Sequence, residues 1–181
     1  IIFSEEFLID DVKRNLVYKL LDEQYNITQL DNEYALLILG YMLSFLSILD
    51  SAQQEMVKQM IVDRLILALS TEEITENLFS LLYDNINNMA HTINLSISAE
   101  LMTDENRESL LSILSENTEL WKVYFIVKIV NNYIKDAGLP INELYSDREI
   151  GSIYFQIIEH VYKMGRNNAY TVVEKILEGF R

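Results

Sequence analysis

The chain has 181 residues, half of them apolar and 23% charged, a composition that allows an ordered core and disfavours intrinsic disorder. It contains no cysteine, which excludes disulfide frameworks, thiolate nucleophiles and cysteine zinc sites. Its net charge of −14 repels phosphate groups and disfavours direct binding to nucleic acid or to anionic membrane surfaces.

The scarcity of turn residues predicts the fold class. Five glycines and one proline suit helices, whereas sandwiches and barrels need many turns. We therefore expect an all-α fold, a compact multi-helix bundle of about eight helices, in a single domain over 1–181. The chain begins at Ile1 rather than Met, which is compatible with the C-terminal part of a longer protein.

The first two helices are predicted over 4–23 and from Asp31 or Asn32 to Leu49. Ser4 is a suitable N-cap for the first. The second carries the most apolar run of the chain, 34–49, which at 16 residues is shorter than the roughly 20 that cross a bilayer. We expect this second helix and the sixth, which is predicted from 117 or 118 to Gly138, at the centre of the bundle.

Two serines at capping-box spacing predict the next helix starts. Ser51 with Gln54 opens the third helix, and Ser70 with Glu73 opens the fourth. The inner stripe of the third would consist of Met56, Met60, Ile61, Leu65 and Leu69.

The fourth helix is predicted over 72–101, with an apolar and a polar side. The apolar side would consist of Ile86, Met89, Ile93, Ile97 and Leu101, and the polar side of Asp84, Asn88, His91 and Ser98. The low helix propensity of 96–98 predicts a kink or break there.

Four further helices complete the expected set. A short helix covers 103–115, and the next runs from 117 or 118 to Gly138, a natural left-handed C-cap. Ser146 with Glu149 opens a helix that ends at Gly165, and the last covers 169–179. The segment 139–145 is the one plausible internal boundary.

Acidic residues concentrate in the middle of the chain. The 57 positions from Leu65 to Trp121 hold ten acids and one base, Arg107, a local balance of −9. Such a surface favours a basic protein partner. The residues that we expect to meet this partner are Glu72, Glu73, Glu76, Asp84, Asp104, Glu105 and Glu108.

The two histidines do not predict a catalytic or metal site. His160 lies on the apolar stripe formed with Ile153 and Ile157, which is typical of a satisfied core histidine. His91 has one carboxylate and several amides near it on a helix face, which are weak metal ligands. We therefore expect no metal, no cofactor and no enzyme activity.

Two classes of function fit these observations. The first is an acidic helical interaction module that binds a basic protein partner, as immunity proteins and small inhibitors do. The second is the ligand-binding and dimerisation core of a transcriptional regulator whose DNA-binding domain lies upstream, since 118–180 is similar to the final helices of TetR-type cores in helix lengths and apolar pattern. We expect a soluble, cytoplasmic protein, and a homodimer is compatible with both classes.

Overall fold

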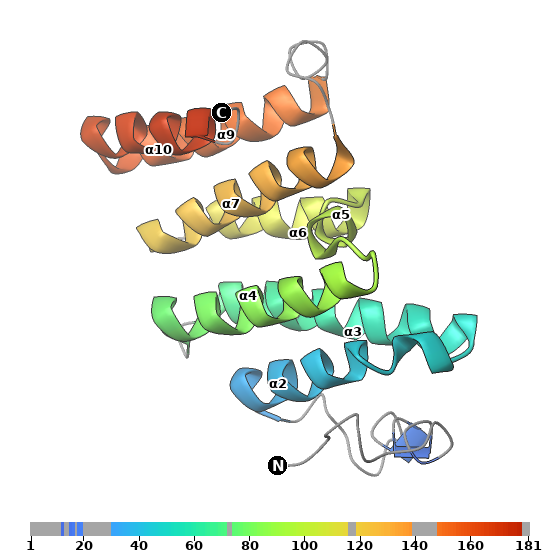
Figure 1. Cartoon of the computed structure of the whole chain (residues 1–181). Helices are drawn as coiled ribbons and strands as arrows, with labels where there is room; N and C mark the ends of the chain where they lie inside the picture. Colours follow the sequence, from blue (N-terminus) through green and yellow to red (C-terminus); the bar gives the residue numbers. More distant parts are fainter. Residues whose placement is uncertain are drawn as a thin grey trace. The chain divides into compact units, whose positions relative to one another are not determined.

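The computed structural model describes residues 12, 15–16, 18–19, 30–71, 74–115, 119–138 and 148–178. Every regular element in these ranges is a helix, which confirms the all-α class (Figure 1). The chain divides into two compact units, unit 1 (Ile1–Ile97) and unit 2 (Ser98–Arg181). The single domain over 1–181 stays a prediction. Most of the helix expected over 4–23 lies outside the described residues, although Val12 and Lys19 within it are helical.

Unit 1 is organised around α2 (Asn32–Leu43), which packs against both α3 (Ser51–Ser70) and α4 (Glu76–Thr92). The spacing of its apolar residues explains this position, because one side of the helix is aliphatic at every turn. Ala35, Leu36, Leu39, Met42 and Leu43 are at most 1% exposed. The expectation of a central second helix is therefore confirmed for unit 1.

The apolar run does not form one helix to Leu49, as the sequence predicted. α2 ends at Leu43, and a single turn of 3₁₀ helix, η3 (Leu46–Ile48), follows. Ser44 explains the end, because its hydroxyl and its amide both donate to the carbonyl of Tyr41, at 2.6 and 3.1 Å. Such local serine contacts compete with the helical ladder.

α3 begins at Ser51, as predicted, but its capping box and the start of α4 differ from the prediction. α3 is capped by Asp50, whose carboxylate accepts from the amide of Gln53 at 2.9 Å in a capping box one residue earlier than expected. Ser70 is the last residue of α3, and its hydroxyl donates to the carbonyl of Leu67. Thr75 caps α4 instead. Correspondingly, Met56 of the expected inner stripe of α3 is exposed.

The helix expected over 72–101 is broken at 93–96, just before the predicted weak point. α4 ends at Thr92 and α5 (Ile97–Leu101) follows. The turn needs a left-handed residue, which Asn94 supplies with φ 57°. Ser98, expected on the polar side, is fully buried at the first turn of α5, whereas Asp84, Asn88 and His91 are exposed as predicted.

Unit 2 contains α6 (Asp104–Ser115), α7 (Leu120–Ala137), α9 (Arg148–Met164) and α10 (Arg166–Glu178). α9 packs against α6, α7 and α10, and α10 also packs against α7. α7 ends at Gly138 with φ 62°, as predicted. α10 begins three residues before the expected 169. The predicted starts at 117, 118 and 146 lie outside the described residues.

A partly buried polar connection joins three helices of unit 2. The hydroxyl of Tyr154 on α9 donates to Oδ1 of Asn131 on α7 at 2.7 Å. The Asn131 amide nitrogen donates to the carbonyl of Lys175 on α10 at 3.0 Å. Burial raises the pKa of Tyr154 above its ordinary value, so the hydroxyl keeps its proton and remains a donor.

Leu39→Asp tests the role of α2. Leu39 is 1% exposed, and an unpaired charge there costs several kcal/mol of a total stability of about 5–15 kcal/mol. We expect loss of the cooperative thermal transition of unit 1, measured by circular dichroism. Leu37→Asp, two residues away and 37% exposed, is the control and should leave the melting temperature nearly unchanged. Equal effects of the two changes would show that α2 is not central.

Candidate functional site

The structure places five of the seven predicted partner-binding acids. Glu76 and Asp84 are exposed on α4 of unit 1. Asp104, Glu105 and Glu108 are exposed on α6 of unit 2. Glu72 and Glu73 lie outside the described residues. The placed acids thus belong to two units, and a single shared face stays a prediction.

The acid cluster on α6 is partly compensated by its own helix. Arg107 Nη2 donates to the Asp104 carboxylate at 2.9 Å, one turn away. Such an exposed pair contributes little to stability, but the positive charge of Arg107 weakens the attraction of Asp104 for other cations. α4 has no lysine or arginine, so Glu76 and Asp84 have no such basic residue on their own helix.

Charge differs strongly between the units. Unit 1 has fifteen acids and five basic residues, a balance of −10, whereas unit 2 has thirteen acids and nine basic residues, a balance of −4. Together these give the −14 of the whole chain. The first arginine or lysine after Arg64 is Arg107, so the last part of unit 1, residues 65–97, has neither. Unit 1 therefore carries most of the net negative charge of the chain.

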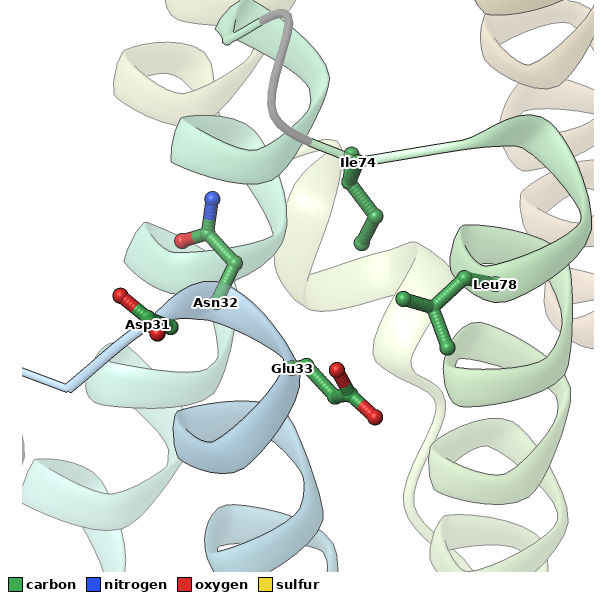
Figure 2. Close-up of a pocket in the computed structure, with 5 residues that line it drawn as sticks. All are labelled: Asp31, Asn32, Glu33, Ile74 and Leu78. Atoms are coloured by element: carbon green, nitrogen blue, oxygen red, sulfur yellow. The ribbon is translucent and has the colours of Figure 1, made fainter.

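A pocket of about 320 Å³ lies in unit 1 where α2 begins and α4 begins. Its lining combines charged and apolar side chains: Asp31, Asn32, Glu33, Ile74 and Leu78. Figure 2 shows the carboxylates of Asp31 and Glu33 on the α2 side, with Ile74 and Leu78 on the opposite side. Asp31 and Glu33 are exposed, whereas Asn32 and Ile74 are buried. The pocket therefore offers anionic groups at its edge and an aliphatic wall.

A buried arginine holds the chain beside this pocket. Arg64 on α3 is 8% exposed, and its Nη1 donates to the carbonyl of Leu30 at 2.8 Å and to Oδ1 of Asn32 at 3.3 Å. The Asn32 amide nitrogen donates to the hydroxyl of Thr71 at 3.3 Å. These contacts join α3 to Asn32, the first residue of α2. Because Asn32 is held in place, its neighbours Asp31 and Glu33 are held in place as well.

Neither the pocket nor Arg64 was predicted from the sequence. The pocket joins residues about 43 positions apart in the sequence, such as Asp31 and Ile74. The periodic pattern of apolar residues predicts local helices but not contacts at this separation. Arg64 did carry a signal, because it follows Ile61 by three residues and precedes Leu65, both of which are buried. An arginine on the apolar side of a helix indicates a buried, hydrogen-bonded guanidinium.

Other candidate chemistry is limited in the described ranges. No three histidine or acidic side chains there converge on a metal position. The lining of the pocket includes no tyrosine. No helix in the part of the chain that the structure describes is long and apolar enough to cross a membrane.

His160 is not the satisfied core histidine that the sequence predicted. The residue is half-buried on α9, and its Nε2 atom is buried without a hydrogen-bond partner. Burial, and secondarily the charge of Lys163, lower the pKa of His160 below its ordinary value of 6.5. Both causes disfavour the protonated ring. His91 is exposed on α4, as expected.

No protein-family model, curated protein or solved structure matches this chain.

Arg64→Ala tests the buried network. We expect the free energy of unfolding to fall by about 1.5–3 kcal/mol, since the change leaves buried acceptors without a charged donor. Chemical denaturation measures this loss. Lys58→Ala on the same helix is the control: its ion pair is with Glu55, an exposed residue one turn away, and we expect a loss below about 1 kcal/mol. A smaller loss for Arg64→Ala than for Lys58→Ala would contradict the role given to Arg64.

The lowered pKa of His160 predicts acid sensitivity. The unfolded state binds the proton more tightly than the folded state, so the contribution of His160 to stability is favourable above about pH 6.5 and is lost as the pH falls below it. We expect the melting temperature of His160→Phe to fall less between about pH 7.5 and about pH 5.5 than that of the unmodified protein. Identical slopes for the two proteins would refute the assignment.

Proposed function

We propose that this protein is an acidic helical interaction module in which unit 1 binds a basic protein partner, in the manner of an immunity protein or a small inhibitor. The observation that carries the proposal is the balance of −10 in unit 1 together with a pocket whose exposed groups are carboxylates. Long-range attraction steers a basic partner to such a surface and raises the association rate.

The pocket suits the side chain of a lysine or arginine. Each has an aliphatic stem that lies well against apolar surface and a cationic head that needs anionic acceptors. Ile74 and Leu78 supply the apolar wall, and Asp31 and Glu33 supply the carboxylates. The pocket is thus a reasonable point for one anchoring residue of the partner.

The outward side of α2 supports the same surface. Tyr34, Leu37 and Tyr41 are 57%, 37% and 48% exposed, and their spacing of three and four residues puts them on one side of the helix. Aromatic side chains surrounded by charged groups are typical of protein interfaces. Glu33 and Asp31 lie at the N-terminal end of this stripe, next to the pocket.

The regulator core is the alternative proposal. It would need a cavity for a small molecule, and such cavities are predominantly apolar with few polar groups. The pocket of unit 1 has two carboxylates among its five lining residues, which supports the basic-partner proposal more than this one.

Asp31→Asn with Glu33→Gln tests the proposal. The immobilised protein is exposed at low salt to a soluble extract of its source cells, and the retained proteins are identified by mass spectrometry. We expect a basic protein that elutes as salt is raised, because screening acts within about 10 Å at 0.1 M. Its affinity should fall about tenfold or more in the double variant, since hydrogen bonds to charged groups contribute about 1.5–3 kcal/mol.

The matched control is Glu55→Gln with Asp63→Asn. It makes the same charge change in unit 1, on exposed residues of α3 that interact with Lys58 and Gln59 of their own helix. Retention should be nearly unchanged. Equal losses in both double variants would mean that net charge matters and the pocket does not. If both variants retained every protein as the unmodified chain does, unit 1 would have no partner of this class.

A further inference from the structure

Exposed apolar side chains of unit 2 gather on two consecutive helices. All the exposed large apolar residues described in unit 2 lie on α9 or α10, namely Phe155, Tyr162, Met164, Tyr170, Val173 and Leu177. Phe155 is 67% exposed and Tyr162 62%. Single exposed residues are ordinary, but a concentration on one pair of packed helices marks an interaction surface.

The spacing of these residues is that of helices that pack on other helices. On α10, Tyr170, Val173 and Leu177 follow each other by three and four residues. On α9, Phe155 and Tyr162 are seven residues apart with half-buried Ile158 between them. Alternating steps of three and four keep a stripe on one side of a helix and are typical of helix–helix interfaces.

The outward side of α9 also has room for a neighbour. Gly151 precedes Phe155 by one helical turn, and a Cβ atom added to Gly151 would meet no atom within 4 Å. The glycine therefore lies in open space, where its lack of a side chain permits close approach of another helix.

The net charge of α9 and α10 indicates which kind of partner fits this surface. Residues 148–178 hold four acids and four basic residues, so α9 and α10 together are neutral in a chain of −14. Two copies of an acidic protein repel each other least where their contacting surfaces are neutral. A basic partner, in contrast, gains nothing here and is attracted to unit 1.

The order of charges along α10 also fits a second copy. Arg166 is at its first turn, and Glu174 and Glu178 are in its second half. Lys175 also lies in the second half, but its Nζ atom is over the Tyr124 ring of α7, 5.0 Å from the ring centroid. In a two-fold symmetric pair of antiparallel helices, the first turn of one copy lies beside the last turns of the other. Opposite charges therefore face each other in such a pair.

We infer that a second copy of this chain docks on the outward stripes of α9 and α10 to form a two-fold symmetric dimer. This inference does not depend on the basic partner of unit 1. The two associations differ in their response to salt: salt weakens attraction between opposite charges, whereas it relieves the repulsion between two copies that each carry −14.

Sedimentation equilibrium of the full chain tests the dimer. We expect a species of twice the 21.2 kDa chain mass, and a dissociation constant that decreases as salt is raised. Phe155→Ser with Leu177→Ser should raise the dissociation constant about tenfold or more, because each change acts twice in a symmetric interface. Leu81→Ser is the control, since Leu81 is 67% exposed like Phe155 but lies on α4 of unit 1.

Cross-linking keeps the inference testable if the double variant fails to fold. The chain has no cysteine, so Val173→Cys creates a single reactive site on the stripe, and a short bismaleimide should join two copies of this variant. Leu81→Cys should remain uncoupled. A monomer at every concentration and salt, a dimer weakened equally by the α9–α10 and Leu81 changes, or equal cross-linking of both cysteine variants would overturn the inference.

Discussion

The buried guanidinium of Arg64 is the interaction on which the surface of unit 1 depends. A charge that is 8% exposed is tolerated only when it is hydrogen-bonded, and Arg64 finds its acceptors at the carbonyl of Leu30 and at Asn32. These contacts determine where α2 begins. Because Asn32 is held inward, the neighbouring carboxylates of Asp31 and Glu33 lie at the surface and border the pocket.

The same physical property, net charge, separates the two proposed associations. Unit 1 combines a balance of −10 with an exposed tyrosine stripe on α2, a combination that suits a basic protein. The neutral pair α9 and α10 combines zero net charge with six exposed apolar side chains, a combination that suits another copy of the chain. One protein can therefore take part in both contacts without competition for the same residues.

The sequence predicted helices well because their apolar periodicity is a local property. The left-handed end of α7 at Gly138 and the buried side of α2 follow directly from residue type and spacing. Cap positions were less predictable. Asp50 and Ser51 are both good caps, and the choice between them depends on which side of α3 becomes buried.

Most of the candidate site could not be predicted from the sequence, because the site joins residues that are far apart along the chain. Asp31 and Glu33 meet Ile74 and Leu78 only because α4 packs against α2. The acidic region from Leu65 to Trp121 led to the hypothesis of a basic partner, but it did not predict that its placed acids fall in two units. Ser98 shows the same limit of prediction from sequence. Its position on the polar side of the expected helix predicted exposure to solvent, but the residue is fully buried.

The central claim is that a cationic side chain enters the pocket of unit 1. The most direct measurement is a methyl NMR titration of the full chain with a lysine- and arginine-rich peptide at low salt. The account predicts the largest shifts at the methyl groups of Ile74 and Leu78, which line the pocket, and small shifts at Val173 on α10. Shifts of equal size at all three residues, or the largest at Val173, would contradict it.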